Sequence, residues 1–132
     1  MEQHAKGIFQ VNLQPQPLSD PDADKALGRM SINKTFAGDL VATSKGEMLM
    51  AGTEVKGSAG YVAIERVSGS LNGLKGSFVL QHTGTMNRGT PQLSVTVVPD
   101  SGTGELVGLT GQLAIIIADG EHRYEFEYSL PN

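Results

Sequence analysis

Three side chains of this sequence, one carboxylate and two imidazoles, are the best suited to chemistry: Glu65, His82 and His122. A carboxylate beside an imidazole can share a proton, hold the ring in one tautomer or orient a polar ligand. The tyrosines add hydroxyl groups that donate or accept hydrogen bonds. What these groups do depends on whether the folded chain brings them to one surface.

Residues 58–86 predict a β-hairpin that places Glu65 and His82 on the same face. The dipeptide Asn72-Gly73 separates two alternating apolar runs and tolerates the positive φ angles of a type I′ turn. Counting back from a two-residue turn sets Glu65 and His82 diagonally across the ladder, on the more apolar face. This face also carries Tyr61, Ala63, Val67, Phe78 and Leu80. A bulge at either of two glycines in these strands would send one strand's side chains to the opposite face.

A second hairpin is predicted at Asp119-Gly120, again a type I′ signal. The register places Ile117 opposite His122 on an apolar inner face, near one end of the sheet. The same face continues through Tyr124, Phe126 and Tyr128. Ile116 and Ala114 point outward, and we interpret them as a modest apolar patch suited to a subunit interface.

The other strands are predicted at residues 6–14, 28–43, 47–53 and 91–98. Within the second of these, Gly38 is interpreted as a bend, and Ser44-Lys45-Gly46 as the turn that ends it. Lys34 falls on the apolar side of this strand, with its amine directed to a rim. The acidic stretch at residues 18–25 is interpreted as a solvated loop.

These elements predict an all-β fold: a single eight-stranded antiparallel up-and-down β-barrel over residues 1–132. A β-sandwich is the alternative, because strand patterns alone do not establish closure. The length of 132 residues fits one domain, and 17 glycines suit many tight connections. A barrel of this size has an interior that side chains fill or that holds one small ligand.

Composition argues against several classes of partner. The net charge is −4, no basic patch occurs and Trp is absent, so nucleic acid is not expected as a partner. No run approaches the roughly 20 apolar residues of a membrane helix, and the N-terminus lacks the apolar core of a secretory signal. With no cysteine, disulfides and thiolate chemistry are excluded. We therefore expect a cytoplasmic protein with no membrane partner.

The Gly-rich stretch GTGELVGLTG at residues 102–111 invites comparison with phosphate-binding loops. It lacks the Lys of a P-loop, and no following helix is predicted, so we interpret its glycines as bends in a strand. Glu65, His82 and His122 match no standard metal-ligand spacing. No cofactor and no metal are expected.

Three segments resemble a known bacterial family: GSAGYVAIERV (57–67), GSFVLQHTGTM (76–86) and VVPDSGTGELVGLTG (97–111). They are similar to the domain of unknown function 3224, which is grouped with the allene oxide cyclase-like β-barrels, and the likeness spans residues 7–130. The resemblance implies an eight-stranded antiparallel barrel, often oligomeric, and no known activity. Allene oxide cyclase has a buried glutamate in its cavity, but no cyclase motif matches here, and Glu65 is similar only in character.

Three functions remain open. The leading hypothesis is a homo-oligomeric binding protein that holds a small apolar or amphipathic molecule in the barrel lumen. The second is an isomerase- or cyclase-type enzyme using the same lumen, and the third is a solidly packed interaction or scaffold protein. A purely structural role is the alternative for Glu65 and His82: the two side chains would hydrogen-bond each other and stabilise the barrel. The candidate ligand-binding residues are Glu65, His82, Tyr61, Phe78, Leu80, His122 and Tyr124.

Overall fold

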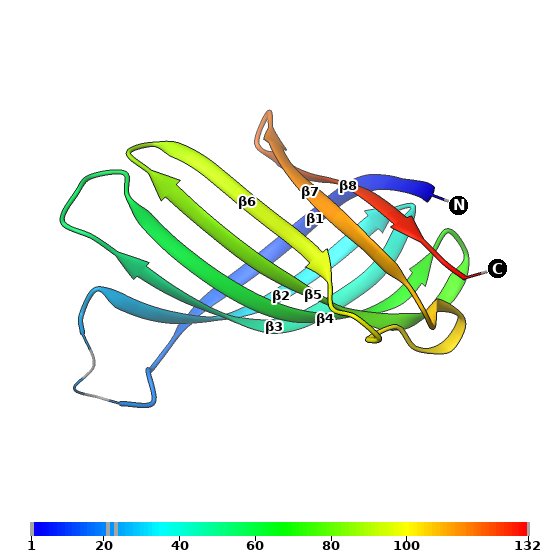
Figure 1. Cartoon of the computed structure of the whole chain (residues 1–132), viewed down its shortest axis with the longest axis horizontal. Coiled ribbons are helices and arrows are strands. Elements are labelled where there is room, and N and C mark those ends of the chain that lie inside the picture. Colours follow the sequence, from blue (N-terminus) through cyan, green and yellow to red (C-terminus); the bar gives the residue numbers. More distant parts are fainter. Residues whose placement is uncertain (1, 21, 23, 132) are drawn as a thin grey trace.

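A computed structural model describes residues 2–20, 22 and 24–131, which form one closed antiparallel barrel with its strands in chain order (Figure 1). The elements are β1 (Glu2–Gln16), β2 (Leu27–Gly38), β3 (Leu40–Gly52), β4 (Ala59–Leu71), β5 (Leu74–Asn87), β6 (Thr90–Val97), the short 3-10 helix η1 (Gly104–Leu106), β7 (Thr110–Ala118) and β8 (Glu121–Ser129). The predicted eight-stranded barrel is confirmed and the sandwich alternative is excluded. Within the described residues, no helix has the length and apolar character needed to cross a membrane.

The central hairpin, β4–β5, has the predicted register. Asn72-Gly73 adopts φ angles of 47° and 86°, as a type I′ turn requires. Ala63 pairs with His82, and Gly69 pairs with Gly76, so neither glycine marks a bulge. The side chains predicted to share one face therefore do share it.

The second predicted hairpin, β7–β8, is also confirmed. Asp119 and Gly120 form its turn, and Ile117 pairs with His122. Ile117 is nevertheless exposed, contrary to the expected apolar interior, because it lies beside the hairpin tip where the barrel wall is incomplete. Ile116 points outward and is exposed, as predicted.

The boundary between β2 and β3 differs from the prediction. The chain turns at Gly38 and Asp39, and residues 44–46 lie inside β3 rather than in a turn. Gly38 has a φ of +104°, which favours glycine. The neighbouring Asp39 accepts a hydrogen bond from the backbone N–H of Lys6 on β1, at 2.9 Å. The turn is thus supported by a contact with a distant strand, which the local pattern does not reveal.

The Gly-rich stretch is a loop over residues 102–109 and not a bent strand, which corrects the prediction for it; only residues 110–111 belong to β7. It contains η1, and its glycines Gly104 and Gly108 adopt positive φ angles of 61° and 83°. Leu106 and Leu109 are buried in the main apolar core. Thr103 hydrogen-bonds with Ser77 on β5, so the loop is held against the barrel wall.

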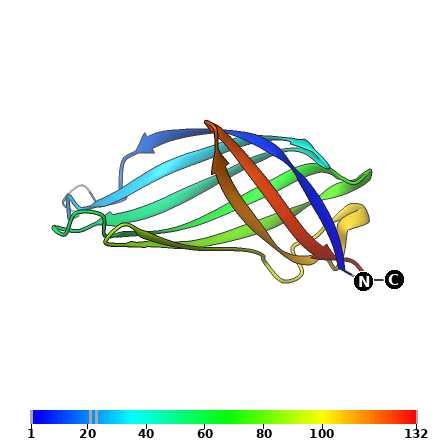
Figure 2. The ribbon, with the colours of Figure 1, turned by 90° about the horizontal axis from the view of Figure 1, so that it is seen from above.

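The two ends of the barrel differ. At the closed end lie the turns at residues 39 and 72–73, the loop with η1, and both termini, which are side by side in both views (Figures 1 and 2). At the open end lie the connections at residues 17–20, 24–26, 53–58 and 88–89, and the turn at residues 119–120 points toward this end but stops short of it (Figure 1). There the wall is incomplete: β6 and β7 pair only at Thr96 and Gln112, and β1–β8 pairing ends at Phe9 and His122 although β1 continues to Gln16.

Candidate functional site

A polar layer crosses the interior of the barrel between two apolar clusters. The main cluster fills the closed end and includes Phe36, Val67 and Leu80. A smaller cluster lies toward the open end and contains Ile32, Met48 and Ala63. The polar layer consists of Lys34, Ser44, Glu65 and His82, all of them buried. These four side chains are the candidate functional site.

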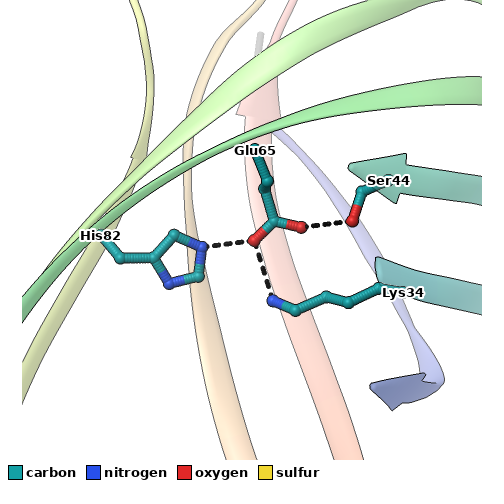
Figure 3. A network of polar contacts seen from close by, with 4 residues as sticks. All are labelled: Lys34, Ser44, Glu65 and His82. Atoms are coloured by element: carbon teal, nitrogen blue, oxygen red, sulfur yellow. Dashed lines mark hydrogen bonds and ion pairs between the residues drawn. The ribbon is translucent and has the colours of Figure 1, made fainter. Parts of the chain in front are cut away.

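Glu65 is the centre of this polar layer, and its carboxylate contacts the other three members (Figure 3). Lys34 Nζ donates to Oε2 at 2.8 Å, and His82 Nε2 lies 2.5 Å from the same oxygen. Ser44 Oγ donates to Oε1 at 2.7 Å. Burying a carboxylate is costly without such partners, so these contacts explain how Glu65 is accommodated at 0% exposure.

Four neighbouring strands supply the layer, one residue each from β2, β3, β4 and β5. Lys34 pairs directly with Ser44, and the alternation of side chains along each strand turns all four inward. Gly46 on β3 pairs with Glu65. A Cβ at Gly46 would meet the backbone oxygen of Ile64 and lie only 2.6 Å from Glu65 Cα, so the missing side chain allows β4 to pack closely there.

The prediction that the Lys34 amine reaches a rim of the barrel is wrong. It is 8% exposed, pairs with Glu65, and lies over the rings of Phe9 and Phe36 at 5.0 and 5.9 Å from their centroids. The prediction placed Lys34 on the apolar face but did not identify its partner. Ser44 was missed because it was assigned to a turn.

The pKa of the Glu65 carboxyl reflects a competition. Burial alone would raise the pKa, but the hydrogen bond from His82, the positive charge of Lys34, and the hydrogen bonds from Lys34 and Ser44 together outweigh it. The result is a pKa lowered from 4.5 to about 2. Glu65 is therefore ionised at neutral pH, and the structure bears out the expected pairing of Glu65 with His82.

Tyr61 is the other candidate that the structure brings to this layer. Its ring lies beside His82, with 6.4 Å between centroids, and it packs against the smaller cluster. Burial and the charge of Glu65 raise the pKa of its hydroxyl. Among the described residues its hydroxyl has no hydrogen-bond partner, unlike that of Tyr124.

The remaining candidates lie elsewhere. Phe78 and Leu80 are fully buried in the main cluster. His122 is half-buried and packs against Phe9, with 5.3 Å between ring centroids. The hydroxyl of Tyr124 accepts from the backbone N–H of Leu40 at 2.9 Å and donates to the backbone oxygen of Ala37 at 2.8 Å, which ties β8 to the β2–β3 turn.

We expect Tyr124→Phe to lower the free energy of unfolding by about 1–3 kcal/mol, because the buried backbone N–H of Leu40 and the partly buried carbonyl of Ala37 lose their partner. Urea unfolding measures this effect. Tyr61→Phe is the matched control and should change stability much less, since its hydroxyl has no such partner. Equal losses in the two variants would contradict the structural role of the Tyr124 hydroxyl.

The inner wall at the open end is apolar and accessible. Four inward-facing side chains there are exposed: Leu13 (42%), Met86 (40%), Leu93 (42%) and Ile117 (70%). Half-buried side chains continue this wall down to the polar layer: Val11, Met30, Met50 and Tyr61. Because the β7–β8 hairpin does not complete the wall here, these side chains remain uncovered. We call this surface the open inner wall.

Metal binding gains no support from this arrangement. Among the residues that the structure describes, no group of three or more histidine or carboxylate side chains is placed to hold a metal ion. Glu65 and His82 meet, but His122 packs against Phe9 and does not join them.

Comparisons with known proteins agree with the fold and the motifs. A family model described as "Protein of unknown function (DUF3224)" matches residues 5–128. A solved structure of a DUF3224-family protein of unknown function from Shewanella oneidensis MR-1 is similar, with 50% identity and a TM-score of 0.94, covering 100% of this chain and 99% of that chain. A search of curated proteins gives no significant match.

Proposed function

This chain belongs to the DUF3224 family, and from that premise we propose that its open inner wall binds a small, mainly apolar molecule. The observation that carries the proposal is the exposure of apolar side chains on the inside of the barrel, next to a buried polar layer. Leu93 and Ile117 are 42% and 70% exposed although they face inward. Concave apolar surfaces with a few convergent polar groups are the usual form of small-molecule sites.

The composition of the wall suits a ligand without a rigid shape. Methionine side chains are flexible and polarisable, and they adapt to varied apolar partners. Three of them, Met30, Met50 and Met86, belong to this wall. At its inner end, His82 and Tyr61 supply polar groups that can orient the ligand.

The packed closed end restricts where in the barrel a ligand can bind. Val67, Phe78 and Leu80 are fully buried there, so this half of the lumen has the solid packing of a scaffold. A ligand is therefore confined to the open end. An enzyme of isomerase or cyclase type would use the same surface, but the potential nucleophiles Lys34 and Ser44 are buried and hydrogen-bonded to Glu65. The allene oxide cyclase-like grouping and the cytoplasmic location stay predictions.

We expect 1-octanol to bind the open inner wall and to shift the ¹³C-methyl resonances of Met30, Met50 and Met86. Leu93→Asp should weaken binding about tenfold or more, because apolar contact worth roughly 1.5–3 kcal/mol is replaced by a charge. Val41→Asp is the matched control, since Val41 is exposed on the outer wall, outside the surface proposed for self-association. Absent shifts, or equal weakening by both substitutions, would refute the proposal.

Self-association is also proposed, through the outer wall. Leu49, Val62 and Ile64 are each more than half exposed there and border a hollow of about 830 Å³. The Arg29–Glu47 ion pair lines the same hollow and supplies both charges, which a two-fold interface between copies can match. Native mass spectrometry of freshly purified protein reports the assembly state together with any molecule retained in the barrel.

A further inference from the structure

The hydrogen bonds around Glu65 determine which nitrogen of His82 carries a hydrogen. Lys34 and Ser44 both donate to the carboxylate, which is ionised at neutral pH. An ionised carboxylate only accepts hydrogen bonds. At 2.5 Å from Oε2, Nε2 of His82 must therefore be the donor. This conclusion holds for both the neutral and the protonated ring.

The other ring nitrogen of His82 is consequently an acceptor in the neutral ring. Figure 3 shows Nδ1 on the side of the ring away from Glu65. Among the described residues it has no hydrogen-bond partner. Yet, among the described residues, every fully buried side-chain nitrogen or oxygen has a hydrogen-bond partner. Nδ1 is therefore not completely sealed in the core, although His82 as a whole is only 3% exposed, and it keeps a free lone pair that a hydroxyl group can contact.

Buried apolar residues flank His82 on the two neighbouring strands. His82 lies between Ala63 on β4 and Val95 on β6, which are both buried. On β5, the residue two positions nearer the open end is Gly84, and the ring of Tyr61 covers it so closely that a Cβ there would overlap the ring. The same ring lies beside the imidazole of His82, with 6.4 Å between centroids. A molecule on the open inner wall thus meets the ring of Tyr61 and, beside it, the acceptor of His82 at the inner end.

We propose that His82 Nδ1 is the atom that recognises the ligand, and that the ligand is an apolar molecule with a hydroxyl head group that donates to it. This inference rests on the proposed function, since it assumes that the open inner wall binds the apolar part. Glu65 has a positioning role: it holds the ring in the tautomer that leaves Nδ1 free. Lys34 and Ser44 keep Glu65 ionised and oriented.

The test compares 1-octanol with 1-methoxyoctane, which has the same alkyl chain but no donor. We expect the alcohol to bind about fivefold more tightly, the gain typical of one neutral hydrogen bond. Long-range ¹H–¹⁵N spectra of the free protein should show the His82 hydrogen on Nε2. The alcohol, and not the ether, should shift the Nδ1 resonance.

Two variants separate recognition from folding. His82→Phe keeps an aromatic ring but removes both ring nitrogens, and it should abolish the preference for the alcohol while the ether still binds. His122→Gln removes an imidazole outside the polar layer and should retain the preference. Equal binding of the two probes to the unmodified protein, or a hydrogen on Nδ1 and not Nε2 in the free protein, would overturn this inference alone. If neither probe binds, the proposed function fails as well.

Discussion

Glu65→Gln should lower the free energy of unfolding by about 3–5 kcal/mol, the usual cost of removing one partner of a buried ion pair. Lys34 is only 8% exposed, and without the carboxylate its ammonium group is left uncompensated. Glutamine has nearly the same size and keeps a carbonyl oxygen as an acceptor. The loss of stability therefore reports mainly the removal of the negative charge of Glu65. Such a loss is a large fraction of the roughly 5–15 kcal/mol by which domains are stable.

A double variant shows whether the uncompensated charge is the cause. Lys34→Met removes the ammonium group, so Glu65→Gln combined with Lys34→Met should be more stable than Glu65→Gln alone. Glu121→Gln is the matched control, because it breaks the exposed Arg123–Glu121 pair and should have little effect. Urea unfolding of the four proteins measures all of these differences. A loss in Glu65→Gln no larger than that in Glu121→Gln would contradict the explanation.

The same variant should alter the acid dependence of stability. The pKa of Glu65 is about 2 in the folded protein against an ordinary value of 4.5. A pKa that folding lowers stabilises the folded state at pH values above the pKa of the unfolded state. That contribution to stability is lost as the pH falls from about 4.5 toward 2. The difference in stability between the unmodified protein and Glu65→Gln should therefore shrink across this range.

Gly46→Ala should be the other strongly destabilising change, with a loss near 3 kcal/mol, the upper part of the range for overpacking. The new Cβ would meet the backbone of Ile64 and Glu65, and neither can move without separating β3 from β4. The substitution should also displace Glu65 from Ser44, which methyl and histidine NMR spectra would register.

Gly52→Ala provides the matched control for this prediction. Gly52 also lies on β3, but a Cβ there would have no neighbour within 4 Å. The Gly52→Ala variant should be as stable as the unmodified protein or slightly more stable, because alanine reduces the conformational freedom of the unfolded chain. If the two alanine variants unfold at the same urea concentration, the close approach at Gly46 does not constrain the site.

Local patterns determined the central features of this protein. The Asn72-Gly73 turn sets the register of β4 and β5 by counting, because a two-residue loop leaves no freedom in the pairing. Alternation then turns Glu65 and His82 to the same apolar face. The contact between these two side chains was therefore predictable from about 30 residues of sequence.

Tertiary structure alone decided the rest. Lys34 and Ser44 reach Glu65 because β2 and β3 pair next to β4, and that arrangement depends on a turn at Gly38 supported by β1. The open inner wall exists because β6 and β7 pair at only one position, which depends on strand lengths and on how the barrel closes. Alternation within one strand tells which side a residue faces, but it carries no information about which distant strand completes the wall or where closure fails.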